Sequence, residues 1–197
     1  MNLISTIAMA MGSSWVSGIR LYAAVATLGL LGRFAHLNLP GELSILTNWW
    51  IIGIASGLFL IEFFADKIPY LDTAWDLVHT AIRPLGGAFV AVASVGDASP
   101  AAQGLAALLG GTLAAGSHLT KAGTRAAANT SPEPLSNWLL SLGEDGLVVG
   151  LGVLALTHPV AALMVTAVLV GLMVLFAAAI VRAVRSRFRT RPALSAR

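Results

Sequence analysis

The chain has no cysteine among its 197 residues, which excludes a disulfide framework, a thiolate metal site and a cysteine nucleophile. Charge is scarce as well, because 11% of the residues are charged whereas 57% are hydrophobic. A soluble globule needs a more polar surface, so this balance predicts a polytopic integral membrane protein. The sequence also lacks a glycine-rich phosphate loop, a zinc-type histidine pair and a nucleophile elbow.

The net charge of +3 comes from one end of the chain. Half of the twelve basic residues lie in the last sixteen positions, at Arg182, Arg185, Arg187, Arg189, Arg191 and Arg197. We interpret this arginine-rich end as a topology signal and expect no nucleic-acid partner. Residues 187–197 are predicted to form a basic cytoplasmic tail.

Apolar runs predict an all-α membrane protein with about six transmembrane helices in a single membrane domain, residues 1–186. The expected spans are 14–34, 48–64, 84–95, 101–128, a fifth that begins at 131–134 and includes the run 147–156, and 160–181. Residues 84–95 are few for a full crossing of the bilayer.

Between the second and third spans, the spacing predicts a short amphipathic helix after Pro69. Asp72, Asp76, His79 and Arg83 recur at intervals of four, three and four, which places them on one helix face. We expect this helix at the cytoplasmic surface or folded under the bundle, with its charged face turned toward the carboxylates of the second span.

The first span contains the small residues Ser13, Ser14, Ser17 and Gly18 just before Arg20. Small residues permit close helix contact or a local break, and they bring Arg20 near the bundle interior.

The arginine tail predicts the orientation, because positively charged ends stay on the cytoplasmic side. Counting back through six spans places both termini in the cytoplasm of the inner (plasma) membrane. The same count places residues 62–83, 121–133 and 144–145 together at the cytoplasmic face.

A faint duplication separates the chain into halves 1–98 and 99–186. Residues 12–20 resemble 110–118, and residues 53–62 resemble 149–158. Two halves of three spans each would form an inverted repeat, as in many transporters. The alternative is a chance alignment of glycine- and alanine-rich segments.

Ionisable residues in membrane helices are costly and indicate function. The transport or gating candidates are Arg20, Glu62, Asp66, His118 and Lys121. A charge cluster that only clasps helices together is the alternative, and its candidates are Asp72, Asp76, His79, Arg83, Arg125, Glu133, Glu144 and Asp145. The spacing of Asp66, Asp72 and Asp76 is a weak metal-binding signal.

Three features resemble a bacterial family of multi-pass membrane proteins known as domain of unknown function number 4126. They are Gly18-Ile19-Arg20, Glu62 followed by Ile68-Pro69 with Asp72 and Asp76, and the segment 129–134 with Glu144 downstream. The resemblance covers most of the chain and implies a membrane protein without supplying an activity.

The leading hypothesis is a small transporter or channel for a small solute, an ion or a lipid head group. The alternatives are a metal-dependent enzyme acting on a lipid phosphate and a non-catalytic assembly or scaffold subunit. We expect no cofactor, the lipid bilayer as partner, and an oligomeric state left open between monomer and homo-oligomer.

Overall fold

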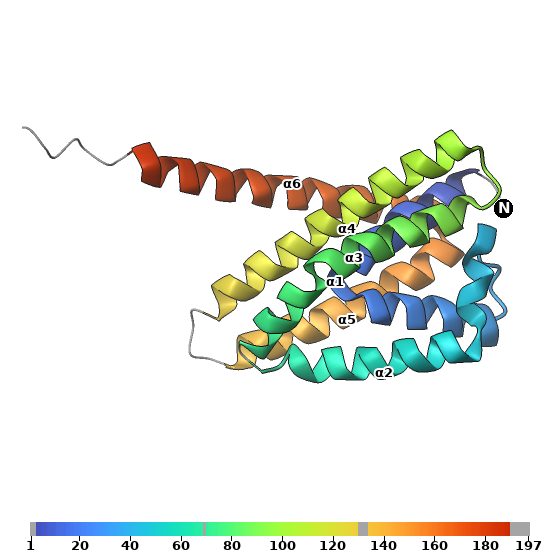
Figure 1. Cartoon of the computed structure of the whole chain (residues 1–197), viewed down its shortest axis with the longest axis horizontal. Coiled ribbons are helices and arrows are strands. Elements are labelled where there is room, and N and C mark those ends of the chain that lie inside the picture. The colour runs from blue at the N-terminus through green and yellow to red at the C-terminus, as the bar shows by residue number, and fades with distance from the viewer. Residues whose placement is uncertain (1–2, 69, 130–133, 190–197) are drawn as a thin grey trace, which may run out of the picture.

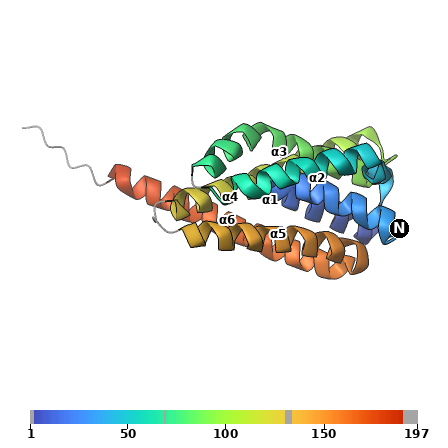
Figure 2. The same cartoon turned by 90° about the horizontal axis from the view of Figure 1, so that it is seen from below.

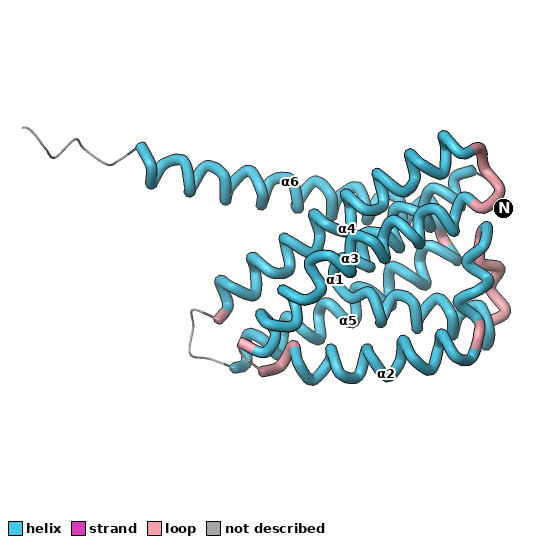
Figure 3. Tube along the Cα trace, viewed as in Figure 1, coloured by secondary structure: helices cyan, strands magenta, loops and turns pink. Residues whose placement is uncertain are grey.

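The computed structural model describes residues 3–68, 70–129 and 134–189, and these residues form helices and loops without a strand (Figure 3). All-α architecture, the predicted class, is confirmed for this part of the chain. The seven described helices are α1 (Leu3–Phe34), η1 (Gly41–Thr47), α2 (Trp49–Ala65), α3 (Leu71–Val95), α4 (Pro100–Ala128), α5 (Pro134–Thr157) and α6 (Pro159–Arg189).

Helix α1 is broken inside the bundle at Arg20, whose φ of −149° and ψ of 85° are not helical. The chain turns back at this break, so both ends of α1 lie at the same end of the molecule (Figure 1). Leu3 lines a cavity with Val95, and Gly41, shortly after α1, packs against Ala93. The first predicted span is therefore a helical hairpin with Arg20 at its tip.

Glycine at position 18 permits this geometry next to the break. A Cβ atom there would collide with the Ala114 carbonyl and with Ser117 Oγ of α4. Ser117 Oγ also donates a hydrogen bond to the Trp15 carbonyl at 2.7 Å. The tip of the hairpin is thus in direct backbone contact with α4, as small residues allow in membrane bundles.

Helices α2 to α6 run between the two ends of the bundle (Figure 1). We call the end where α2 and α4 finish, α3 and α5 begin and α6 terminates the arginine end; η1 and Leu3 lie at the opposite end. In both views α6 extends past the other helices at the arginine end (Figure 2). The described chain thus begins and finishes at opposite ends, whereas the six-span interpretation placed both termini on one side.

Four helices are long and apolar enough to cross a membrane, namely α1, α3, α5 and α6. The bent pair of η1 and α2, with 74° between its members, would be a fifth. The described residues thus support four to five candidate spans, which corrects the expected number of six. Helix α4 is not among them because glycine, polar and basic residues lower its hydropathy.

The separate amphipathic helix and the short third span are also wrong, because both belong to the continuous helix α3, which includes Pro84. Proline usually kinks a helix, but Arg83 before it and Gly87 after it both contact α1 and α4. The charged side of α3 faces inward, whereas Leu77 is 75% and Val78 64% exposed on its outer side. The helix is therefore inside-out relative to a soluble protein, as a lipid-facing helix is expected to be.

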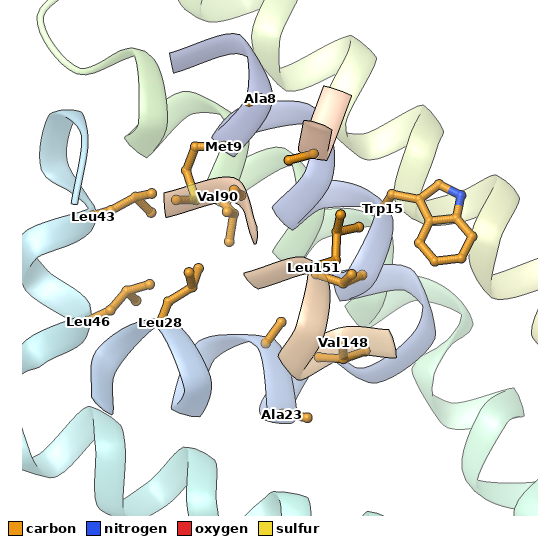
Figure 4. Close-up of a cluster of buried hydrophobic side chains, with 14 of the residues drawn as sticks. Ala8, Met9, Trp15, Ala23, Leu28, Leu43, Leu46, Val90, Val148 and Leu151 are labelled. Carbon is orange, nitrogen blue, oxygen red and sulfur yellow. The ribbon is translucent and has the colours of Figure 1, made fainter. Parts of the chain in front are cut away.

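The apolar core lies between the α1 hairpin and its neighbours (Figure 4). Met9 and Leu28 come from the two halves of α1, and they are joined by Leu43 of η1, Val90 of α3 and Leu151 of α5. Because α1 contacts each of the other six described helices, it is the element around which the bundle is assembled.

Candidate functional site

The candidate site is a network of buried ion pairs at the break in α1. Arg20 is fully buried, and its Nη2 lies 3.0 Å from Asp66 Oδ2 while its Nε lies 2.8 Å from Asp145 Oδ1. The same Nη2 also donates to Ser141 Oγ at 2.8 Å. The broken helix thus places a guanidinium between the end of α2 and the middle of α5.

The break leaves carbonyl groups without helical partners, and two cations satisfy them. Lys121 Nζ donates to the Ile19 carbonyl at 3.2 Å, and Arg83 Nη1 donates to the Gly18 carbonyl at 3.4 Å. The carboxyl end of a helix carries a partial negative charge, which favours cations at this position. Helices α3 and α4 therefore cap the first half of α1 with charged side chains.

Arg83 also joins two carboxylates. Its Nη2 lies 2.6 Å from Glu62 Oε1 and its Nη1 lies 2.9 Å from Asp76 Oδ1. The three side chains are between 0 and 4% exposed. Arg83, which the sequence assigned to a surface clasp, is thus a central member of the network.

Lys121 is shared among four carboxylates. Its Nζ lies 2.8 Å from Asp66, 3.5 Å from Glu144, 3.7 Å from Asp76 and 3.8 Å from Glu62. Only the contact with Asp66 has the length of a strong hydrogen bond. The ammonium group can therefore exchange partners over a short displacement.

Arg125 connects α4 to the ends of α2 and α5. It forms five hydrogen bonds, two of them to the carboxylate of Glu144 and the others to the Asp66 carboxylate, the Asp66 carbonyl and the Asn137 carbonyl. A guanidinium has five N–H groups, so each of them is committed.

The ion-paired groups do not balance. Among the described residues the network contains five carboxylates against four cations, a formal excess of one negative charge when every group is ionised. The carboxylates are Glu62, Asp66, Asp76, Glu144 and Asp145, and the cations are Arg20, Arg83, Lys121 and Arg125. Buried Lys67 and Asp72 carry opposite charges, so including them leaves the excess unchanged. Buried charge is costly in the low dielectric of a membrane protein unless it is paired.

His118 accepts a hydrogen bond from the network. Arg83 Nη1 lies 2.8 Å from His118 Nδ1, and because arginine only donates, this nitrogen must be the acceptor. The ring proton is then on Nε2, which lies 3.2 Å from Thr80 Oγ1. In this arrangement the imidazole is neutral.

Asp66 is the candidate at the end of α2, and its pKa reflects two opposing effects. Burial raises the pKa of this carboxyl, but the charges of Lys121 and Arg20 outweigh burial and hold the pKa below its ordinary value of 3.8. Asp66 is therefore ionised at neutral pH.

Two candidates of the predicted charge cluster lie outside the network. Asp72 accepts hydrogen bonds from the side-chain amide of Asn129 at 3.1 Å. His79 Nδ1 donates to the Trp75 carbonyl at 2.7 Å, and its Nε2 accepts from Tyr22 Oη at 2.9 Å. Glu133, a further candidate, lies outside the described residues.

The weak metal signal is not supported. Asp66 and Asp76 both lie near Lys121, whereas Asp72 is bonded to Asn129. In the part of the chain that the structure describes, no three His, Cys, Asp or Glu side chains are placed to hold a metal ion.

Sequence reasoning missed Ser141, Lys67 and Tyr22. Ser141 Oγ receives hydrogen bonds from Arg20 and from Lys67 Nζ, the latter at 3.1 Å. A lone serine in an apolar helix carries no sequence signal. The position of Lys67, next to Asp66, could have indicated its part in the cluster.

Beside the network, the surface between α3 and α4 holds a cavity of about 200 Å³. Its polar lining includes Asp76, Thr80, His118 and Arg125, and its apolar rim includes Leu77 together with Leu119 and Ala122. We call this cavity the Asp76 groove.

The fold and the network together define a helical membrane protein with a buried charged cluster. Residues 7–179 match the family model described as Domain of unknown function (DUF4126), and the chain belongs to that family. This confirms the resemblance found in the sequence. No curated protein and no solved structure matches the chain.

Proposed function

We propose that this protein is a transporter in which the break in α1 and the buried ion pairs form the transport site. The observation that carries the proposal is the position of Arg20, a charged residue at the tip of a broken helix. Broken helices inside a membrane bundle are typical of transporters, where their ends meet the substrate or the coupling ion. Buried ionisable residues in membrane helices mark ion or substrate pathways.

The network has the chemistry of a site that binds and releases a cation or a proton. Glu62 Oε2, Asp66 Oδ1 and Asp76 Oδ2 are buried and have no hydrogen-bond partner among the residues that the structure describes. Lys121 Nζ lies within 4 Å of four carboxylates, so a movement of its ammonium group toward one carboxylate leaves another without its cation. His118 becomes free to accept a proton when Arg83 moves away from Nδ1. We assign the gating roles to Arg20, Glu62, Asp66, His118 and Lys121.

The proposed orientation follows the arginine residues of α6. The arginine end then faces the cytoplasm of the plasma membrane, and the opposite end, with Leu3 and η1, faces outward. The inverted repeat of halves 1–98 and 99–186 and the tail at 187–197 stay predictions of this proposal.

The test is proton flux in vesicles that contain the purified protein and a lumenal pH dye. After a membrane potential is imposed, the parent protein is expected to conduct protons when candidate solutes are supplied. Glu62→Gln keeps the shape of the side chain but cannot ionise, and it is expected to abolish this flux. Glu42→Gln, at an exposed glutamate of η1, is the matched control and should leave the flux unchanged. Unchanged flux in Glu62→Gln removes Glu62 from the mechanism.

A scaffold subunit is the second candidate, because every member of the network has an ion-pair partner and such pairs can hold helices together. No flux from a folded parent protein with any solute tested would favour this reading. The lipid-phosphate enzyme is not proposed, since Asp66 and Asp76 are paired with cations, Asp72 is bonded to Asn129, and no metal-binding group of His, Cys, Asp or Glu is found among the described residues.

A further inference from the structure

The Asp76 groove has a polar floor and apolar walls. Asp76 and His118 are 3% and 1% exposed and lie at its floor, whereas Leu77 and Leu119 are 75% and 62% exposed at its rim. A few polar groups within an apolar lining are typical of sites for small molecules. The exposed Leu77 and Leu119 place the groove at the surface of the bundle.

The groups in the groove select for a ligand that donates hydrogen bonds. Asp76 Oδ1 is paired with Arg83 and Lys121, but its Oδ2 is buried and has no hydrogen-bond partner within the described part of the chain. Thr80 Oγ1 donates to the Asp76 carbonyl and accepts from His118 Nε2, which leaves it one lone pair that can accept. These oxygens suit a cation that carries N–H groups.

An anion is disfavoured at the same place. Arg125 is the cation that lines the groove, and its five N–H groups are committed to Glu144, Asp66 and Asn137. A phosphate or carboxylate could bind Arg125 only by replacing one of these hydrogen bonds. The guanidinium therefore has no free N–H group for an anion in the groove.

The charge of the network also favours a cation. The groups that face Asp76 are Arg83 and Lys121, and both are shared with other carboxylates. With five carboxylates against four cations among the described residues, one more positive charge would make the network neutral. Neutralisation lowers the cost of buried charge inside a membrane protein.

We propose that the Asp76 groove binds a primary ammonium group on a short alkyl chain. The ammonium would lie against Asp76 and Thr80, and its methylene groups would contact Leu77, Leu119 and Ala122. This inference rests on the proposed transport function, for which it names the substrate class. A lipid head-group amine and a free amine share this chemistry.

The absence of cysteine permits a direct test in vesicles of the full chain. Ala122→Cys places the single thiol in the groove, and Ala126→Cys, at an exposed residue of the same helix outside the groove, is the control. Each variant is treated with aminoethyl methanethiosulfonate, a primary ammonium, and with its anionic sulfonatoethyl analogue. At each cysteine we compare the labelling rate of the ammonium reagent with that of the anionic reagent. This ratio is expected to be about tenfold or more higher at Ala122→Cys than at Ala126→Cys.

Two further measurements identify the ligand. Free ethanolamine should slow labelling of Ala122→Cys, whereas ethanol should not. Protection in phosphatidylethanolamine vesicles but not in phosphatidylcholine vesicles would assign the site to the lipid amine, and protection by ethanolamine in both would assign it to a soluble amine. Adding Asp76→Asn should reduce the ammonium preference at Ala122→Cys to that of the control.

The labelling is independent of transport, so the two proposals can fail separately. Ammonium-selective labelling without proton flux supports the groove and overturns the transporter. Equal reagent preference at the two cysteine positions, or no protection by any amine, overturns the groove. Neither of these comparisons requires the Asp76→Asn protein to fold.

Discussion

Arg83 Nη2 lies 2.6 Å from Glu62 Oε1, and neither side chain is accessible to solvent. The two residues come from different helices, α3 and α2. In the sequence, Glu62 lies among apolar neighbours that disfavour a charged carboxylate unless a cation stands close by. Arg83 is that cation, so Glu62 is part of an ion pair in the arrangement described.

Replacing one member of this ion pair should cost more stability than the same replacement costs once the other member has been replaced. Among the described residues, Arg83→Gln leaves Glu62 with Lys121 as its cation, 3.8 Å away, and we expect a loss of about 3–5 kcal/mol in stability. The double variant Glu62→Gln, Arg83→Gln should lose less than the sum of the single losses, because neither charge is then left unpaired. Thermal unfolding of the four proteins in detergent measures the coupling, and additive losses would contradict it.

Gly18→Ala should destabilise the bundle strongly. The new methyl group would meet the Ala114 carbonyl and Ser117 Oγ, so α1 would have to move away from α4 and overpacking should cost about 1–3 kcal/mol or more. Gly53→Ala in α2 is the matched control, since a Cβ there meets nothing within 4 Å. Alanine is the better helix former, so the control should be neutral or stabilised. Equal melting temperatures of the two variants would show that the tip of α1 does not contact α4 closely.

The hairpin in α1 predicts the topology of the chain. Single cysteines introduced by Leu3→Cys and Ser44→Cys should react with a membrane-impermeant thiol reagent from one side of the membrane, and Ser186→Cys from the other. Labelling of intact cells and of inverted vesicles distinguishes the two sides. Reaction of Leu3→Cys and Ser186→Cys on the same side would favour the six-span topology expected from the sequence.

Asp66 should make the stability of the protein depend on pH in the acidic range. Its folded pKa lies below the ordinary value of 3.8, so its contribution is present above that pH and is lost as the pH falls through the folded pKa. Asp66→Asn should therefore be less stable at pH 7 and should lose less stability than the parent when the pH is lowered below about 4.

The measurement is the melting temperature in detergent between neutral and acidic pH. Asp97→Asn, at an exposed aspartate beyond the end of α3, serves as the control and should follow the parent protein. A parallel acid loss in Asp66→Asn and the parent would show that Asp66 is not held ionised by Lys121 and Arg20.

Local patterns in the sequence located most of the candidate site. Helical spacing placed Asp76 and Arg83 on one face of a helix, and the small residues before Arg20 allowed close helix contact or a local break that brings this arginine inside. These predictions succeed because helix periodicity and side-chain size act over a few residues.

The ion-pair partners of these side chains, and the side of the helix to which they point, depended on contacts between segments distant in the sequence. The sequence placed Arg83 at the membrane surface, yet its partners Glu62 and His118 lie 21 and 35 residues away along the chain. Ser141 is 121 residues from Arg20, and nothing near Ser141 marks it as a ligand of a guanidinium.

Composition and hydropathy by themselves determined that this protein is a helical membrane protein with its few charges grouped in a small number of segments. Only the tertiary structure decided that α1 turns back at Arg20 and that α3 continues through Pro84. The physical reason is that an apolar run has the same hydropathy whether it crosses the bundle or folds into a hairpin. Packing against α4, and the cations that cap the broken end, select the hairpin.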